Sequence, residues 1–155
     1  LILREHHKQP YSRSGFLNLG GIATHADRLI REFRVKTPSR DTLAKNLSGG
    51  NIQKVVLARE ISRNPRVILA AQPTRGLDIG ATEYVRMELL EQRKKGAAIM
   101  LISEDLDEIL ALSDRIAVIY EGRIMDIVPR AEATPEKLGL MMAGVHPEEG
   151  APVVK

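Results

Sequence analysis

The sequence contains no cysteine, no tryptophan and few other aromatic residues. The absence of cysteine excludes a disulfide framework, a thiolate nucleophile and a zinc site built on sulfur. The four histidines lack the local spacing of a metal site, so no metal ligands are expected. Aromatic residues make up 3% of the chain, and without stacking side chains the basic segment 28–40 indicates a solvated helix face and no nucleic-acid surface.

Long apolar runs are also missing. No stretch approaches the roughly 20 consecutive apolar residues of a membrane-spanning helix, and no basic segment followed by an apolar run marks a secretory signal. A chain of 155 residues, of which 43% are hydrophobic and 28% charged, can bury one core and a small satellite subdomain. We therefore expect a soluble, cytosolic domain.

The chain also lacks the loop Gly-x-x-x-x-Gly-Lys-Ser/Thr, whose backbone amides and lysine hold the phosphates of a nucleotide. Without this loop, the chain is expected to bind ATP poorly alone and to hold no cofactor tightly. The first residues, Leu-Ile-Leu-Arg-Glu, are typical of the middle of a helix. We expect the chain to be part of a longer protein.

Apolar periodicity predicts an alternation of helices and strands. Helices are expected at residues 23–33, 48–63, 81–95, 105–112 and 134–142, and strands at 67–71, 97–102, 115–120 and 123–128. The continuous apolar run 67–71 is typical of a strand buried on both faces of a parallel sheet, and Glu121-Gly122 suits the turn of a β-hairpin. The pattern predicts an α/β fold: a helical subdomain, then a mainly parallel sheet with flanking helices and a hairpin.

One predicted helix begins in a way that suits an anion. Ser48 is placed at its N-cap, and Gly49, Gly50 and Asn51 form the first turn, where backbone N–H groups lack intrahelical partners. Glycine lets a phosphate approach the backbone closely, and the positive end of the helix dipole favours it. Asn51 replaces the acid of a capping box, so no carboxylate competes for these donors. In isolation, Ser-Gly-Gly is more often an ordinary helix start.

The Ser-Gly-Gly motif is not isolated in this sequence. Residues 47–54 read Leu-Ser-Gly-Gly-Asn-Ile-Gln-Lys, residues 57–59 read Leu-Ala-Arg, and the predicted strand leads into Pro-Thr-Arg-Gly-Leu-Asp at 73–78. In this order, from about residue 43 to residue 128, the chain resembles the second half of an ABC ATPase domain. The resemblance implies a partial P-loop NTPase fold that contains the second half of the mainly parallel sheet. The Walker loop of this fold would lie before residue 1.

Three positions depart from that family's pattern. In the family, the strand ends in Asp-Glu-Pro-Thr, where the Asp supports magnesium and the Glu polarises the attacking water; Ala71 and Gln72 stand in these places. Alanine has no oxygen for a magnesium shell, and glutamine cannot accept a proton from water. Glu104 stands at the position of the family's switch histidine, and an anion there would repel phosphate. The resemblance therefore implies a degenerate nucleotide site in this half.

Other functional positions of the family are retained. Ser48, Gly49, Gly50 and Asn51 match the signature segment, which in head-to-tail pairs closes over ATP held by the partner half. Asp78 matches the loop that communicates between the two halves, and it also suits the N-cap of the helix that follows. The resemblance implies that this half serves its partner's ATP and has shed its own catalysis.

Within the family, Asn51, Gln53-Lys54 and the segment 73–78 resemble the C-terminal cassette of tandem ATPase subunits that serve monosaccharide or nucleoside importers. The degenerate positions point to the nucleoside branch. The implied partners are the N-terminal cassette of the same chain, transmembrane permease subunits and, indirectly, a solute-binding protein. The full-length protein would use ATP and Mg²⁺ as a peripheral subunit at the cytoplasmic face of the cell membrane.

The resemblance also suggests a division of the chain. Residues 1–46 are expected to form the helical subdomain that docks on the permease, and 47–128 the signature helix with the C-terminal half of the ATPase core. Residues 129–146 would form a C-terminal helix, and 147–155 a flexible tail.

Two other functions remain open. A soluble ABC ATPase of DNA repair or translation would retain the signature helix, although Asn51 and Arg75 argue against it; a coiled-coil insertion, a zinc hook or a basic aromatic arm would favour it, and none occurs in the sequence. The alternative is a structural dimerisation module, which the changes at Ala71, Gln72 and Glu104 would fit.

Overall fold

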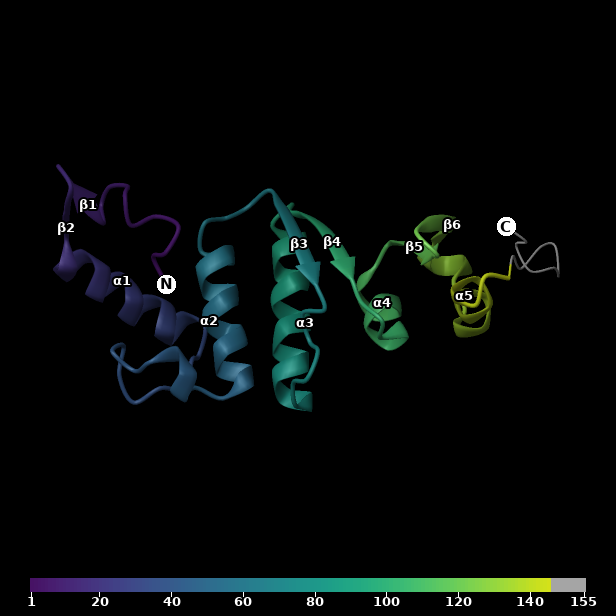
Figure 1. The fold of residues 1–155 in the computed structure, drawn as a ribbon, viewed down its shortest axis with the longest axis horizontal. Helices are drawn as coiled ribbons and strands as arrows, with labels where there is room; N and C mark the ends of the chain where they lie inside the picture. Colours follow the sequence, from purple (N-terminus) through teal and green to yellow (C-terminus); the bar gives the residue numbers. More distant parts are fainter. Residues whose placement is uncertain (146–155) are drawn as a thin grey trace. The chain divides into compact units, whose positions relative to one another are not determined.

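The computed structural model describes residues 1–145, which fall into two compact units, Leu1–Met100 and a second that starts at Leu101 (Figure 1). The predicted flexible tail at 147–155 lies outside the described residues. Within 1–145, no helix combines the length and the apolar character that crossing a lipid bilayer requires.

The first unit opens with a short antiparallel pair, β1 (Ser12–Arg13) and β2 (Phe16–Leu17), and then α1 (Leu19–Glu32). The helix predicted at 23–33 is confirmed, but it begins earlier, because the Oδ1 atom of Asn18 accepts a hydrogen bond from the Gly21 N–H at 3.0 Å. This cap allows the helix to include Gly20 and Gly21, which precede the predicted start.

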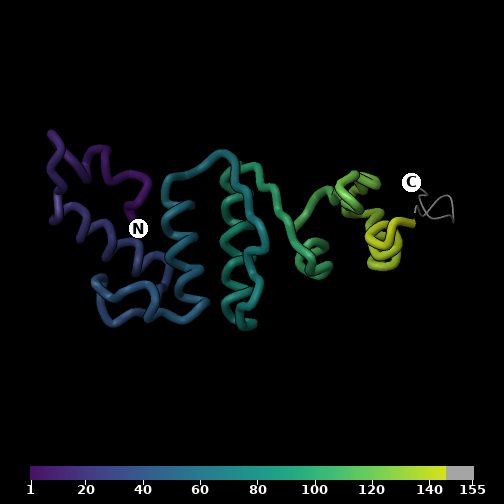
Figure 2. The backbone as a smooth tube through the Cα atoms, viewed as in Figure 1, coloured from purple at the N-terminus to yellow at the C-terminus, as the bar shows by residue number. Residues whose placement is uncertain are grey.

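The helix α2 (Gly49–Ile61) follows a 3₁₀ turn, η1 (Ala44–Asn46), and contacts α3 (Ile79–Lys94). Figure 2 follows the path of the chain through these helices. The buried side chains of α3 form one stripe at helical spacing: Ala81, Val85, Leu89 and Gln92. The helix predicted at 81–95 is thereby confirmed, and Gly96 adopts φ +90° directly after its C-cap, as a C-terminal glycine does.

The strands β3 (Val67–Ala71) and β4 (Ala98–Ile102) are hydrogen-bonded neighbours joined through α3, and Figure 1 draws both arrows in the same direction. The prediction that β3 is buried on both faces is wrong for this chain. Val67 and Leu69 are 71% and 66% exposed, whereas Ala70, which points to the opposite face, is buried. Met100 of β4 is also exposed, at 60%. One face of the pair is therefore apolar and open to solvent.

The second unit contains α4 (Leu106–Leu112), the hairpin of β5 (Arg115–Tyr120) and β6 (Arg123–Pro129), a 3₁₀ turn η2 (Arg130–Glu132), and α5 (Pro135–Met142). Tyr120 pairs with Arg123, so Glu121 and Gly122 form the turn, with φ of 45° and 78°. Positive φ at both residues is typical of a type I′ two-residue turn, and the predicted hairpin is confirmed.

An apolar cluster packs the elements of the second unit together. Its buried members come from both strands, from the segment after β6 and from α5: Ile116, Val118, Val128, Ala133, Leu138 and Met141. The α5 helix begins as predicted, because Pro135 occupies its first position and the Thr134 hydroxyl accepts from the Lys137 N–H at 3.2 Å.

Candidate functional site

Ser48 lies directly before α2, at the predicted N-cap, with an extended backbone of φ −65° and ψ 157°. Its carbonyl oxygen accepts the first helical hydrogen bond, from the Ile52 N–H at 2.9 Å. Its side chain makes no capping hydrogen bond. The N–H groups of the first turn therefore keep the capacity to donate to a group outside the helix.

The Ser48 hydroxyl contacts the side chain of Asn51 instead. Asn51 Nδ2 donates to Ser48 Oγ at 2.9 Å, and Asn51 Oδ1 accepts from the Lys36 N–H at 2.8 Å. Lys36 lies in the segment that connects α1 to α2. Both polar atoms of the Asn51 side chain thus make hydrogen bonds within the chain. Its backbone N–H remains among the first-turn groups that can donate to a group outside the helix.

The two glycines of the first turn have different surroundings. A Cβ atom built on Gly49 would meet nothing within 4 Å, whereas one on Gly50 would lie 3.0 Å from the Ala81 Cβ and 3.9 Å from Asp78 Oδ2. Gly49 therefore leaves the open side of the helix end accessible, and Gly50 allows α2 to approach the start of α3. The two helix starts, each with a partial positive charge, lie next to each other.

Asp78 is the N-cap of α3. Its Oδ1 atom accepts a hydrogen bond from the Ala81 N–H at 2.8 Å, which confirms the capping function expected from the sequence. The start of α3 is thus satisfied by a carboxylate of its own, while the start of α2 has no such cap. An anion that approaches the paired helix starts would find its free donors on α2.

Ala71 and Gln72 lie at the end of β3, where the chain turns toward α3. Gln72 has φ 48°, a left-handed conformation that is unfavourable for a residue with a side chain. The turn is held from α2, because Gln53 Nε2 donates to the carbonyl oxygen of the buried Pro73 at 2.9 Å. The turn that contains Gln72 is therefore hydrogen-bonded to α2. The sequence motif alone did not indicate this contact.

Lys54, the next residue along α2, makes two further contacts. Its Nζ atom donates to the Arg34 carbonyl oxygen at 3.2 Å and lies 4.7 Å from the centre of the Tyr84 ring of α3. Burial, followed by the charge of Glu88, raises the pKa of the Tyr84 hydroxyl, so this ring is neutral at physiological pH. Lys54 connects α2 to both of its neighbours.

Glu104 follows β4 and belongs to the second unit, where its side chain is exposed. The adjacent Asp105 caps α4, since its Oδ1 accepts from the N–H groups of Asp107 and Glu108. The structure thus gathers Ser48, Gly49, Gly50, Asn51 and Asp78 in the first unit, together with the turn that carries Gln72.

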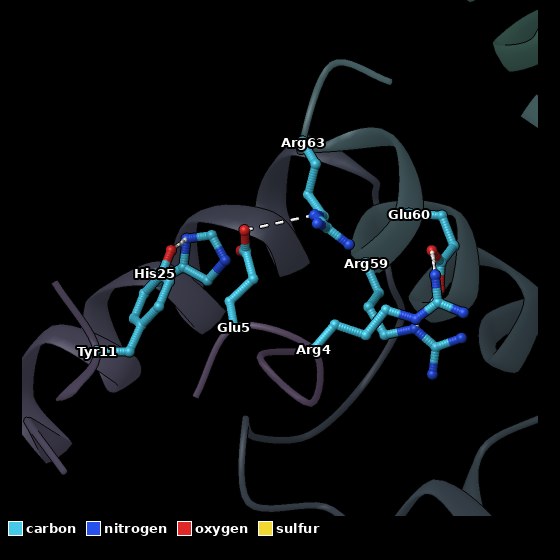
Figure 3. Close-up of polar contacts among 7 residues, drawn as sticks. All are labelled: Arg4, Glu5, Tyr11, His25, Arg59, Glu60 and Arg63. Carbon is cyan, nitrogen blue, oxygen red and sulfur yellow. Dashed lines mark hydrogen bonds and ion pairs between the residues drawn. The ribbon is translucent and has the colours of Figure 1, made fainter. Parts of the chain in front are cut away.

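The far end of α2 is tied to the N-terminal segment by ion pairs (Figure 3). Arg4 contacts Glu60 at 3.0 Å, and Arg63 contacts Glu5 at 3.4 Å. These pairs are partly exposed, and each contributes about 0–1 kcal/mol. Nearby, the Tyr11 hydroxyl lies 3.0 Å from His25 Nδ1.

A polar cleft of about 280 Å³ lies at the same far end of α2. It is formed by the C-terminal parts of α1, α2 and α3, and its lining includes Glu32, Ile61, Gln92 and Lys95. Its charged side chains are of both signs, and none of the residues predicted to bind nucleotide lines it.

The residues at the start of α2 fit a phosphate group, because the helix end has uncapped donors and Gly49 leaves room beside them. The residues at the end of β3 do not fit a magnesium ion. Ala71 offers no side-chain oxygen, and within residues 1–145 no three His, Cys, Asp or Glu residues are grouped as metal ligands.

Three curated relatives of the chain are import ATP-binding proteins. The chain is 51% identical over 149 residues to the guanosine import ATP-binding protein NupO of Bacillus subtilis, and 46% identical over 144 residues to the nucleoside import ATP-binding protein NupA of Lactococcus lactis. These matches cover 96% and 93% of the chain but 29% and 28% of the relatives. The chain thus spans less than a third of the length of the proteins it resembles. A glucose import ATP-binding protein of Haloferax volcanii is 48% identical over 130 residues, 83% of the chain and 24% of that protein.

Solved structures agree on the fold. A dimeric ATP-binding cassette bound to ADP and phosphate matches with a TM-score of 0.63 at 23% identity, over 76% of the chain and 51% of the cassette. An ATP-binding subunit of an ABC transporter matches with a TM-score of 0.64 at 22% identity, over 77% of the chain and 55% of the subunit. No family model matches the sequence. The chain is a homologue of the ATP-binding proteins of nucleoside and sugar importers, and it has, in part, the fold of an ABC ATPase cassette.

Proposed function

We propose that this chain is part of the ATP-binding subunit of an ABC importer for nucleosides or simple sugars, and that the start of α2 completes an ATP site whose Walker loop belongs to a partner cassette. The observation that carries the proposal is the uncapped first turn of α2. Ser48 leaves the backbone donors free, and Gly49 leaves the approach to them open. The relatives are import ATP-binding proteins, which suggests the ligand, ATP, and the process, import.

The partner cassette is proposed to be the N-terminal cassette of the same full-length chain, and this chain the C-terminal one. Each match covers less than a third of its relative, which leaves room for a second cassette. Residues 1–46 would dock on transmembrane permease subunits at the cytoplasmic face of the membrane, and a solute-binding protein would deliver the solute.

The nucleotide site that this half would share with its own Walker loop is proposed to be degenerate. Ala71 supplies no oxygen for Mg²⁺, and Gln72 can orient water but cannot take its proton. By the family resemblance, Glu104 stands at the position of the switch histidine, where a negative charge would repel phosphate. ATP hydrolysis with Mg²⁺ would therefore occur at the site capped by Ser48, and the chain alone would be inactive.

The test is the ATPase rate of the full-length subunit with its permease, with Ser48→Arg compared with Ser62→Arg. The first variant places a bulky cation at the start of α2, and the second makes the same change at the other end of the same helix. We expect Ser48→Arg to abolish hydrolysis while nucleotide still binds to the partner's Walker loop, and Ser62→Arg to retain the rate. Wild-type hydrolysis by Ser48→Arg would favour a purely structural module.

Degeneracy is tested by restoring the family's residues, Ala71→Asp, Gln72→Glu and Glu104→His, in the full-length protein. If these positions set the asymmetry, the triple variant hydrolyses ATP at two sites and its rate rises. Unchanged ATPase and transport rates would contradict this part of the proposal.

A further inference from the structure

The contact between Asn51 and Ser48 has a consequence for the direction of the serine proton. We propose that Asn51 is a positioning residue that turns the hydroxyl proton of Ser48 outward, toward the phosphate of the partner's ATP. This inference rests on the proposed function, because the relatives' ATP binding supplies the phosphate.

The orientation of the Asn51 amide is fixed by Lys36. The backbone N–H of Lys36 can only donate, so the Asn51 atom that faces it at 2.8 Å must be the acceptor, Oδ1. The Nδ2 group is then directed to Ser48 Oγ, at 2.9 Å. Because Nδ2 can only donate, the hydroxyl oxygen of Ser48 is the acceptor in this contact.

The direction of this hydrogen bond determines what Ser48 can do next. A serine hydroxyl has one proton, and that proton cannot be given to Asn51 Nδ2, which has no acceptor capacity. Ser48 is exposed, and its side chain does not cap α2. The proton therefore remains available to an oxygen outside the chain, and phosphate oxygens are strong acceptors.

Asn51 also protects the backbone donors of α2. A serine at an N-cap ordinarily accepts a hydrogen bond from an N–H group of the first turn. If Asn51 were absent, the Ser48 side chain could rotate into that geometry and occupy one of the donors that the phosphate needs. Removal of the Asn51 amide would thus weaken phosphate binding through Ser48.

The experiment is a double-mutant cycle in the full-length subunit, with Ser48→Ala, Asn51→Ala and both changes together. Titration calorimetry with Mg²⁺ and AMP-PNP, an ATP analogue that is not hydrolysed, gives the dissociation constant without turnover. We expect Ser48→Ala and Asn51→Ala each to weaken binding at the capped site about tenfold. The double variant should match Ser48→Ala within about twofold, because Asn51 acts through Ser48. In the ATPase assay, KM should rise and kcat should change little.

Lys54→Met is the matched control. Lys54 holds the segment that connects α1 to α2, through the Arg34 carbonyl oxygen, and no hydrogen bond joins it to Ser48. The Lys54→Met variant should bind AMP-PNP within about twofold of wild type. This result would show that loosening the connecting segment does not by itself weaken binding, so that the loss in Asn51→Ala comes from the changed direction of the Ser48 hydroxyl. Thermal unfolding of each variant checks that the fold is kept.

The inference is overturned if the losses of the two single variants multiply in the double variant, or if either single variant binds as wild type. Ser48→Arg distinguishes this failure from that of the proposed function. If Ser48→Arg abolishes hydrolysis while the losses multiply, only the positioning by Asn51 is wrong; if Ser48→Arg hydrolyses normally, the capping function itself is wrong.

Discussion

At the level of single residues, the two glycines in the first turn of α2 differ: Gly49 faces open space, and Gly50 packs against α3. Gly50 lies against α3, where an added Cβ would be 3.0 Å from the Ala81 Cβ. We expect Gly50→Ala to lower the free energy of unfolding by about 1–3 kcal/mol, because neither helix can shift without disturbing the other. Urea titration of the full-length protein measures this loss.

Gly49→Ala is the control for Gly50→Ala. The space around Gly49 is open, so the added methyl group meets no atom within 4 Å. Its effect on the free energy of unfolding should stay within about 1 kcal/mol and tend to stabilise the helix. Equal losses for the two variants would contradict the close approach of α2 and α3.

His25 gives the first unit a dependence on pH. Burial, followed by the charge of Arg28, lowers the pKa of His25 below its ordinary value of 6.5. The unfolded chain therefore binds the proton more readily, and stability is lost as the pH falls from 6.5 through the folded pKa. We expect His25→Gln to lose less stability than wild type when the pH is lowered from about 8 to about 5. These two values lie on either side of the ordinary pKa of histidine. Urea midpoints at the two pH values report this, and an equal loss in both proteins would contradict it.

At the scale of elements, the second unit depends on the close contact between the end of α5 and the hairpin. Gly144 has φ +81°, and a Cβ there would lie 2.6 Å from the Tyr120 ring. We expect Gly144→Ala to cost about 2–4 kcal/mol, from left-handed strain and overpacking together. Gly122→Ala has a similar φ of +78° but open surroundings, and should cost about 1–2 kcal/mol. Similar costs in thermal unfolding would contradict the contact with Tyr120.

The sequence predicted most elements because local signals agreed with one another. Asp78 and Gly96 mark the two ends of α3, and the stripe from Ala81 to Gln92 is buried as its spacing predicts. The Glu121-Gly122 pair likewise sets the pairing next to the turn, Tyr120 with Arg123 and Ile119 with Ile124; farther along, an irregularity between Val118 and Ile119 shifts the register. Where caps, turns and periodicity all indicate the same element, the local sequence is sufficient to predict that element.

The elements and contacts that were missed depend on partners distant in the sequence. The β1–β2 pair is too short to show alternation, and the burial of β3 depends on what covers each face of its sheet. The sequence placed Asn51 at the candidate site but did not show that its side chain is held by Lys36. No local pattern reports a contact between a side chain and a distant backbone group.

At the scale of the whole molecule, the open apolar face of β3 and β4 affects the behaviour of the chain on its own. Val67, Leu69 and Met100 are all more than half exposed. We expect the isolated chain to self-associate, and Leu69→Glu to shift it toward the monomer. Leu43→Glu changes a leucine that is 59% exposed outside the sheet and should leave association unchanged. Sedimentation velocity distinguishes these outcomes, and a monomeric wild-type chain would contradict the prediction.

We propose that this half caps its partner's ATP and does not hydrolyse its own. The most direct test is the steady-state ATPase rate of the full-length subunit with its permease, measured for Ser48→Arg beside Gln72→Ala. We expect Ser48→Arg to abolish hydrolysis, because the start of α2 can no longer accept the partner's phosphate. Gln72→Ala should keep the wild-type rate, because its site is proposed to do no chemistry. The reverse pattern, with hydrolysis kept by Ser48→Arg and lost in Gln72→Ala, would contradict it.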